Sequence, residues 1–181
     1  MTITPDEMLD LFCQVVDLKE KKKNLYQDAL AGCADQVGKE TFRYLLDSEA
    51  SHLDEIQKIH NELKKGASWG DACRYVETGA EDARQLFKRI AEEHRKATTR
   101  CADDATALTT GMQLEEASIK FFEDKLGRAT EPAQKKFLER MAAAEREHRT
   151  VLADLQFYYT DPQAWFMEKS GARLDGAGAV T

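Results

Sequence analysis

Two short motifs in the sequence combine a carboxylate and an imidazole at helical spacing. Glu49 and His52 form one Glu-x-x-His motif, and Glu145 and His148 form the other. In an α-helix, residues i and i+3 lie on the same side, so each motif would present both groups to the same volume. Such a pair supplies two ligands for a transition-metal ion. Because charged helices generate one motif of this kind by chance, only the occurrence of two copies favours a metal site.

The two motifs occupy equivalent places in an internal repeat. Tyr26 lies 23 residues before Glu49, and Phe122 lies 23 residues before Glu145. Each interval would include the end of one helix, a turn and most of the following helix. Equal intervals indicate two copies of one helical hairpin, each of which must cover an apolar face. Two antiparallel hairpins predict an all-α four-helix bundle with inward-facing metal ligands.

The helices that would position these motifs can be outlined from caps and apolar spacing. Thr4, Pro5 and Glu7 form a helix start, with threonine as the cap and proline at the first helical position. Apolar spacing predicts helices over residues 5–34, 36–63, 81–97, 103–126 and 132–160. The expected organisation is one domain over 1–166, made of hairpin 5–64, crossover 65–102 and hairpin 103–160, and a flexible C-terminal tail over 167–181. Trp165 and Phe166 would anchor the start of this tail to the bundle.

Composition argues against several classes of partner and site. The formal net charge is −7 at pH 7, and no basic cluster lies apart from acidic residues, so we expect no nucleic-acid or membrane partner. The N-terminal residues lack the basic and apolar regions of a signal peptide, and the four cysteines include no C-x-x-C pair. We therefore expect reduced thiols in a cytoplasmic protein, with Cys13 and Cys33 buried. His60 and His94 have no second ligand at helical spacing, so we expect them at the surface or an interface.

Several stretches resemble a known family. The residues GMQLEEASIKFFEDKL and KKFLERMAAAEREHRTVLADL resemble the second hairpin of the rubrerythrin group within the ferritin-like superfamily. DSEASHLDEI is similar to part of its first hairpin, and DPQAWF is similar to the tails of rubredoxin-free members. The resemblance implies a ferritin-like four-helix bundle with a non-haem di-iron site, redox chemistry with peroxide or dioxygen, and frequent dimers.

The resemblance also implies a set of metal ligands, which in this chain are Glu49, His52, Glu115, Glu145 and His148. Glu49 and Glu145 would bridge the two metal ions, and each histidine would bind one of them. A further glutamate is often found three residues after the ligand of the third helix, where this chain has Ser118. The resemblance also allows the hydroxyl of Tyr26 to form a hydrogen bond near the metals, although a core tyrosine needs no such role.

The resemblance further implies one more carboxylate on the first helix, seven residues before Tyr26, but this position is Lys19. One hypothesis is that a helix bulge turns Glu20 inward as the missing ligand. A second is that the ammonium group of Lys19 replaces the charge of one metal ion, which leaves a single ion bound by Glu115, Glu145 and His148. In this second hypothesis Lys19 modulates the site.

A third hypothesis is that no metal binds and that lysines neutralise the buried carboxylates, which are costly to bury without a cation. Lys19 and Lys23 are the residues expected to do this. Lys23 is equivalent to Ile119 in the repeat, and it could also bury its stem while its ammonium group stays in water. Lys21 and Lys22 are expected on a solvated face.

The function expected from these observations is that of a rubrerythrin-like, metal-binding oxidoreductase with an altered di-metal site. It would bind one or two iron ions, with manganese or zinc as substitutes, and would reduce peroxide or dioxygen or oxidise iron. A separate electron-donor protein would re-reduce the centre, because the chain has no cysteine-rich rubredoxin module. We also expect a homodimer. The alternatives are a bundle that binds or senses one metal ion without turnover, and a metal-free structural bundle.

Overall fold

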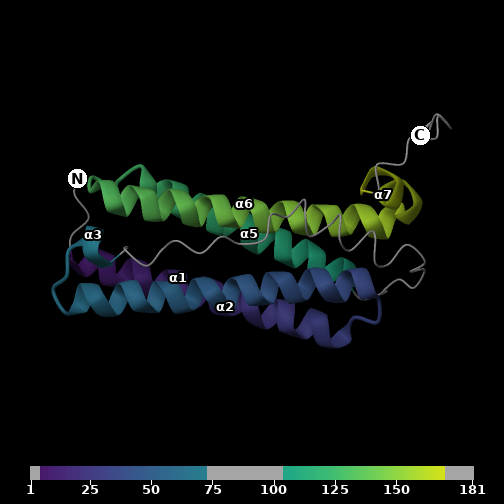
Figure 1. Cartoon of the computed structure of the whole chain (residues 1–181), viewed down its shortest axis with the longest axis horizontal. Helices are drawn as coiled ribbons and strands as arrows, with labels where there is room; N and C mark the ends of the chain where they lie inside the picture. The colour runs from purple at the N-terminus through teal and green to yellow at the C-terminus, as the bar shows by residue number, and fades with distance from the viewer. Residues whose placement is uncertain (1–4, 73–103, 170–181) are drawn as a thin grey trace, which may run out of the picture.

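The structure is a computed structural model that describes residues 5–72 and 104–169 (Figure 1). The described part of the chain is all-α and contains no strand. Its helices are α1 (Pro5–Gly32), α2 (Gln36–Lys64), α3 (Trp69–Ala72), α5 (Asp104–Leu126), α6 (Pro132–Thr160) and α7 (Pro162–Lys169). The predicted helix over 81–97 and the tail beyond residue 169 lie outside the described residues, as do His94, Cys73 and Cys101.

The four long helices pack as two pairs. The most extensive packing joins α5 to α6 and α1 to α2, and further contacts join α1 to α5 and α2 to α6. Figure 1 shows α1 and α2 side by side, with α5 and α6 lying along them. The two predicted hairpins are therefore present, and their second helices both contact the opposite hairpin. No described helix is both long and apolar enough to cross a membrane.

The helix starts follow from local capping. The side chain of Asp35 caps α2 by accepting a hydrogen bond from the backbone N–H of Gly38 at 2.7 Å. The second carboxylate oxygen of Asp35 accepts a hydrogen bond from the Tyr158 hydroxyl at 3.0 Å, which ties this turn to α6. Pro132 begins α6, where its missing N–H has no cost. Gly66 follows α2 with a φ of +88°, a conformation that favours glycine at the turn.

Two apolar clusters fill the bundle at either end of a polar middle layer. One cluster includes Tyr26, Phe42, Leu155 and Trp165, and the other includes Phe12, Ile56 and Phe137. Trp165 is fully buried and donates a hydrogen bond from Nε1 to Asp154 at 2.7 Å, so it anchors α7 on α6 as predicted. Cys33 is buried as expected, but Cys13 is exposed because its position on α1 faces away from both clusters.

Candidate metal centre

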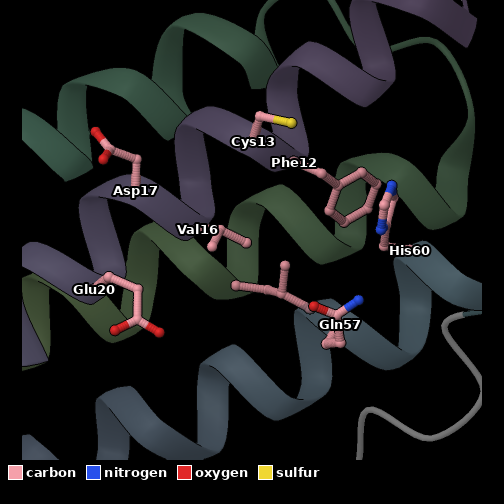
Figure 2. A pocket seen from close by; sticks show the side chains of 8 residues that line it. Phe12, Cys13, Val16, Asp17, Glu20, Gln57 and His60 are labelled. Carbon is pink, nitrogen blue, oxygen red and sulfur yellow. The ribbon is translucent and has the colours of Figure 1, made fainter.

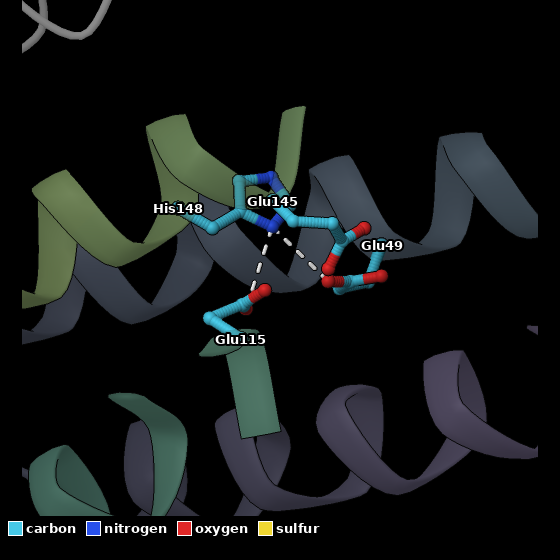
Figure 3. A group of neighbouring side chains, drawn as sticks. All are labelled: Glu49, Glu115, Glu145 and His148. Carbon is cyan, nitrogen blue, oxygen red and sulfur yellow. Dashed lines mark hydrogen bonds and ion pairs between the residues drawn. The ribbon is translucent and has the colours of Figure 1, made fainter. Parts of the chain in front are cut away.

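Four ligand-type side chains converge between the two apolar clusters. Glu49 comes from α2, Glu115 from α5, and Glu145 and His148 from α6. One donor atom from each lies within 4.8 Å of the others, and all four residues are at most 1% exposed. Figure 3 shows the imidazole of His148 directed at the carboxylates of Glu49 and Glu115. This buried group could hold a metal ion.

The ammonium group of Lys19 lies inside this layer. Its Nζ is 2.9 Å from Oε2 of Glu49, also contacts Oε1 of Glu145, and is 3.3 Å from Nδ1 of His52. An ammonium group has three N–H donors, and each of them has an acceptor here. Lys19 therefore points inward, as the second and third hypotheses for this residue require.

The ammonium group of Lys22 lies in the same layer, which corrects the prediction of a solvated side chain. Lys22 is fully buried, with Nζ 2.7 Å from Oε1 of Glu49, 2.8 Å from Oε2 of Glu115, and in contact with Oε2 of Glu145. The three carboxylates converge on this position from α2, α5 and α6. They supply enough negative charge to hold an ammonium group that would otherwise extend to water.

Glu49 and Glu145 each bridge the two lysines. In both residues one carboxylate oxygen contacts Nζ of Lys19 and the other contacts Nζ of Lys22. This is the arrangement that bridging carboxylates would have between two metal ions. The two ammonium groups therefore occupy two neighbouring cation positions inside the bundle.

The two histidines differ in protonation because their neighbours differ. Burial opposes a charged ring at His148, but contacts with Glu115 and Glu49 raise its pKa to about 9. The protonated ring donates from Nδ1 to Glu49 at 3.1 Å and from Nε2 to the Ser48 hydroxyl at 2.7 Å. Burial and the adjacent Lys19 lower the pKa of His52 to about 3, so this ring is neutral and its Nδ1 accepts from Lys19.

Glu49, Glu145 and Lys22 are held in their charged forms by their neighbours, whereas Glu115 is not. Burial alone would raise the pKa of Glu145, but Lys19 and Lys22 lower it to about 2. The same two lysines lower the pKa of Glu49 well below its usual range, against the effect of burial. Burial prevails at Glu115, whose pKa is raised. The three carboxylates raise the pKa of Lys22 despite its burial, so the ammonium form is favoured.

Two hydroxyl groups lie next to the ligand set. Tyr26 donates a hydrogen bond to Oε1 of Glu115, and burial together with this carboxylate raises the pKa of the phenol. Ser118, one helical turn after Glu115, is fully buried, and its hydroxyl has no hydrogen-bond partner among the described residues. A buried hydroxyl without a partner is unfavourable, so a polar ligand on this side of α5 would be stabilised by a hydrogen bond with Ser118.

Glu20 lies outside the cluster. The helix α1 is continuous through this position, and the carboxylate of Glu20 is 3.7 Å from Nζ of Lys23 with both side chains partly exposed. Glu20 lines a separate pocket of about 440 Å³ between α1 and α2, together with Phe12 and His60. Figure 2 shows these three side chains. The predicted inward turn of Glu20 is therefore absent, and Lys23 does not neutralise the carboxylates. Both side chains point away because Lys19 and Lys22 use the inward face of α1.

Lys22 is the residue that sequence reasoning missed. Its spacing from Lys19 is three residues and from Tyr26 four, so all three belong to one face of a helix. The repeat also aligns Lys22 with Ser118, the position where the resemblance placed an additional ligand. The signal was present in the sequence, but the choice between Lys22 and Lys23 depended on which one meets the carboxylates of the other helices.

Comparison of the chain with protein-family models, with curated proteins and with solved structures finds no match. The chemistry of the centre therefore has to be inferred from its geometry. Two metal ions do not fit the residues present, because the ammonium group of Lys19 occupies the space between Glu49, Glu145 and His52. One ion fits the group of Glu49, Glu115, Glu145 and His148 if Lys22 moves out of it.

Proposed function

We propose that the protein is a rubrerythrin-like helical bundle that binds a single divalent transition-metal ion. The ligands would be Glu49, Glu115, Glu145 and His148. The observation that carries this proposal is the convergence of four buried donors from three helices within 4.8 Å of one another. Three carboxylates and one imidazole are a donor set that iron, manganese and zinc all accept.

The charge of the cluster supports one ion and not two. Once Lys22 has moved out of the group, the carboxylates of Glu49, Glu115 and Glu145 carry −3 and Lys19 adds +1, which leaves −2. One divalent ion supplies the opposite charge when His148 binds it as a neutral imidazole, the form that ligates metals. A second divalent ion would leave the buried centre with an excess of +2, which is strongly unfavourable in a low-dielectric interior.

Metal binding or sensing without turnover is therefore favoured over di-iron catalysis. An iron ion in this position would supply one-electron redox chemistry toward peroxide or dioxygen. A two-iron centre is what the resemblance implies for that reaction, and Lys19 occupies the place of the second ion. Any turnover would also require an electron donor, and we propose a separate protein for this role. The expected homodimer is a separate proposal, which light scattering would test.

A metal-free structural bundle is the second candidate, and one observation favours it. The ammonium groups of Lys19 and Lys22 contact all three carboxylates, so the buried cluster is neutral with His148 protonated and with no ion present. Such a network satisfies its own polar groups. It would hold the two hairpins together without a cofactor.

Metal titration of the chelator-stripped protein separates these functions. Calorimetry with Zn²⁺, Mn²⁺ and anaerobic Fe²⁺, followed by elemental analysis after dialysis, should give one equivalent per chain. The variant Glu115→Gln should lose this binding, whereas the control Glu116→Gln, on the exposed side of α5, should keep it. Absence of binding at millimolar metal would favour the second candidate, the metal-free structural bundle. Two equivalents per chain, with rapid peroxide-dependent oxidation of the Fe²⁺ form, would instead favour the di-iron enzyme.

A further inference from the structure

We propose that Lys22 is an internal competitor for the metal ion, whose ammonium group occupies the ion's position in the metal-free protein and is displaced when the ion binds. This inference rests on the proposed function of binding one ion. It concerns the regulation of that site, because it sets how much metal is needed to fill it. It also links the site to α1, a helix that contributes no metal ligand.

The position of Lys22 carries this inference. Its Nζ lies 2.7 Å from Glu49 and 2.8 Å from Glu115, and it also contacts Glu145. These are the three carboxylates of the candidate ligand group. An ion bound to the same oxygens at about 2.0–2.2 Å would be too close to a second cation, so the ammonium group must leave before the ion enters.

Lys19 is not displaced in the same way. Lys19 contacts Oε2 of Glu49 and Oε1 of Glu145, whereas Lys22 contacts the other oxygen of each residue. The contacts of Lys19 can therefore persist when the oxygens facing Lys22 bind an ion. Lys19 then acts as a permanent cation that limits the site to one metal, and Lys22 acts as an exchangeable one.

The side chain of Lys22 is suited to exchange. A lysine has a flexible four-carbon stem, so its ammonium group can move several ångströms without a change in the helix. Lys22 is flanked by Lys21, which is exposed, and Lys23, which is partly exposed. Movement toward this surface would give the ammonium group water in place of the carboxylates, and α1 would lose its ion pairs with α2, α5 and α6 at this position.

Ser118 is a second observation that points to a ligand on this side of the cluster. Its hydroxyl is fully buried without a hydrogen-bond partner among the described residues. It lies on the same face of α5 as Glu115, which binds Lys22. In the metal-free arrangement this hydroxyl is unsatisfied, and a polar group that accompanies an ion would give it a partner.

The test compares the metal affinity of three proteins. Wild type, Lys22→Met and the control Lys21→Met are stripped with a chelator and titrated with Zn²⁺ or Mn²⁺ against a competing indicator dye. Lys22→Met should bind one ion at least tenfold more tightly than wild type. Lys21→Met should bind like wild type, because its lysine pairs with Asp17 on the surface. Equal affinities of Lys22→Met and wild type would overturn the role of Lys22 while leaving the proposed function intact.

Thermal unfolding with and without metal keeps the inference testable if Lys22→Met is unstable. In chelator, the melting temperature of this variant should be lower than that of wild type. Added metal should raise the melting temperature of the variant more than that of wild type. If added metal raises the melting temperature of neither protein, both the inference and the proposed function are overturned. Tight binding by Lys22→Met with none by wild type would overturn both the displacement of Lys22 and the proposed function, because Lys22 would then exclude the ion from a metal-free bundle.

Discussion

Replacement of Lys19 by glutamate should convert the cluster from a self-neutralised network into one that needs metal. In wild type, three carboxylates are balanced by Lys19, Lys22 and protonated His148. Lys19→Glu removes one positive charge and adds a fourth carboxylate, so the same buried centre carries −2 when no ion is present. The new side chain would also lie beside Glu49, Glu145 and His52, which Lys19 now contacts.

The expected loss of stability follows from breaking a fully buried ion pair, which costs about 3–5 kcal/mol because the partner charges are left uncompensated. For a domain of this size, each kcal/mol shifts the melting temperature by about 2–4 °C, so Lys19→Glu should melt roughly 10 °C below wild type in chelator. Metal at about 100 times its dissociation constant would raise the free energy of unfolding by about 2.7 kcal/mol, which restores most of the stability lost in the variant.

The assay is thermal or urea unfolding in chelator and in Zn²⁺ or Mn²⁺, with elemental analysis of the dialysed protein. Lys21→Glu is the matched control, because it makes the same change of charge at an exposed position and should shift the melting temperature only slightly. Lys19→Glu should also bind more metal than wild type. A melting temperature in chelator within about 2 °C of wild type, together with unchanged metal content, would refute the idea that Lys19 stands in for a cation.

Two further substitutions test the structure around the centre. Tyr26→Phe should destabilise the protein by about 1.5–3 kcal/mol in urea unfolding, because it removes a buried hydrogen bond to the Glu115 carboxylate; a change below about 0.5 kcal/mol would contradict that bond. Gly38→Ala should cost about 1–3 kcal/mol, since its Cβ would lie 2.2 Å from the Tyr159 hydroxyl oxygen and 2.7 Å from Sγ of Cys33. Gly32→Ala, with no atom within 4 Å of the new Cβ, is the control, and equal stability of the two alanine variants would rule out the clash.

The helices could be read from the sequence because their determinants are local. Apolar spacing and the prolines at positions 5 and 132 predict where α1 and α6 begin, and the repeat predicts two paired hairpins. The Glu-x-x-His spacing also placed Glu49 and Glu145 at one level, since both sit equally far along equivalent hairpins. The finer ferritin-like classification stays a prediction, because it depends on a resemblance that no comparison supports.

The identity of the inward lysines was decided by tertiary structure. Helical spacing does not decide which of the charged side chains of α1 are buried. Lysines on such a helix can bury their stems and keep their ammonium groups in water. Lys22 is buried because carboxylates from α2, α5 and α6 meet at its ammonium group, and their combined charge outweighs the cost of removing it from water. Glu20 points outward because Lys19 and Lys22 occupy the inward face of the continuous helix α1.

The sequence by itself determined which helices form and which turn of each one carries ionisable groups, since helical periodicity acts within one segment. It also determined that Lys19 stands where a ligand was expected. Only the tertiary structure decided that two ammonium groups, and not one, fill the space between the carboxylates. The physical reason is that the free energy of a buried charge depends on the distance to opposite charges on other helices, and those distances exist only after the hairpins have packed.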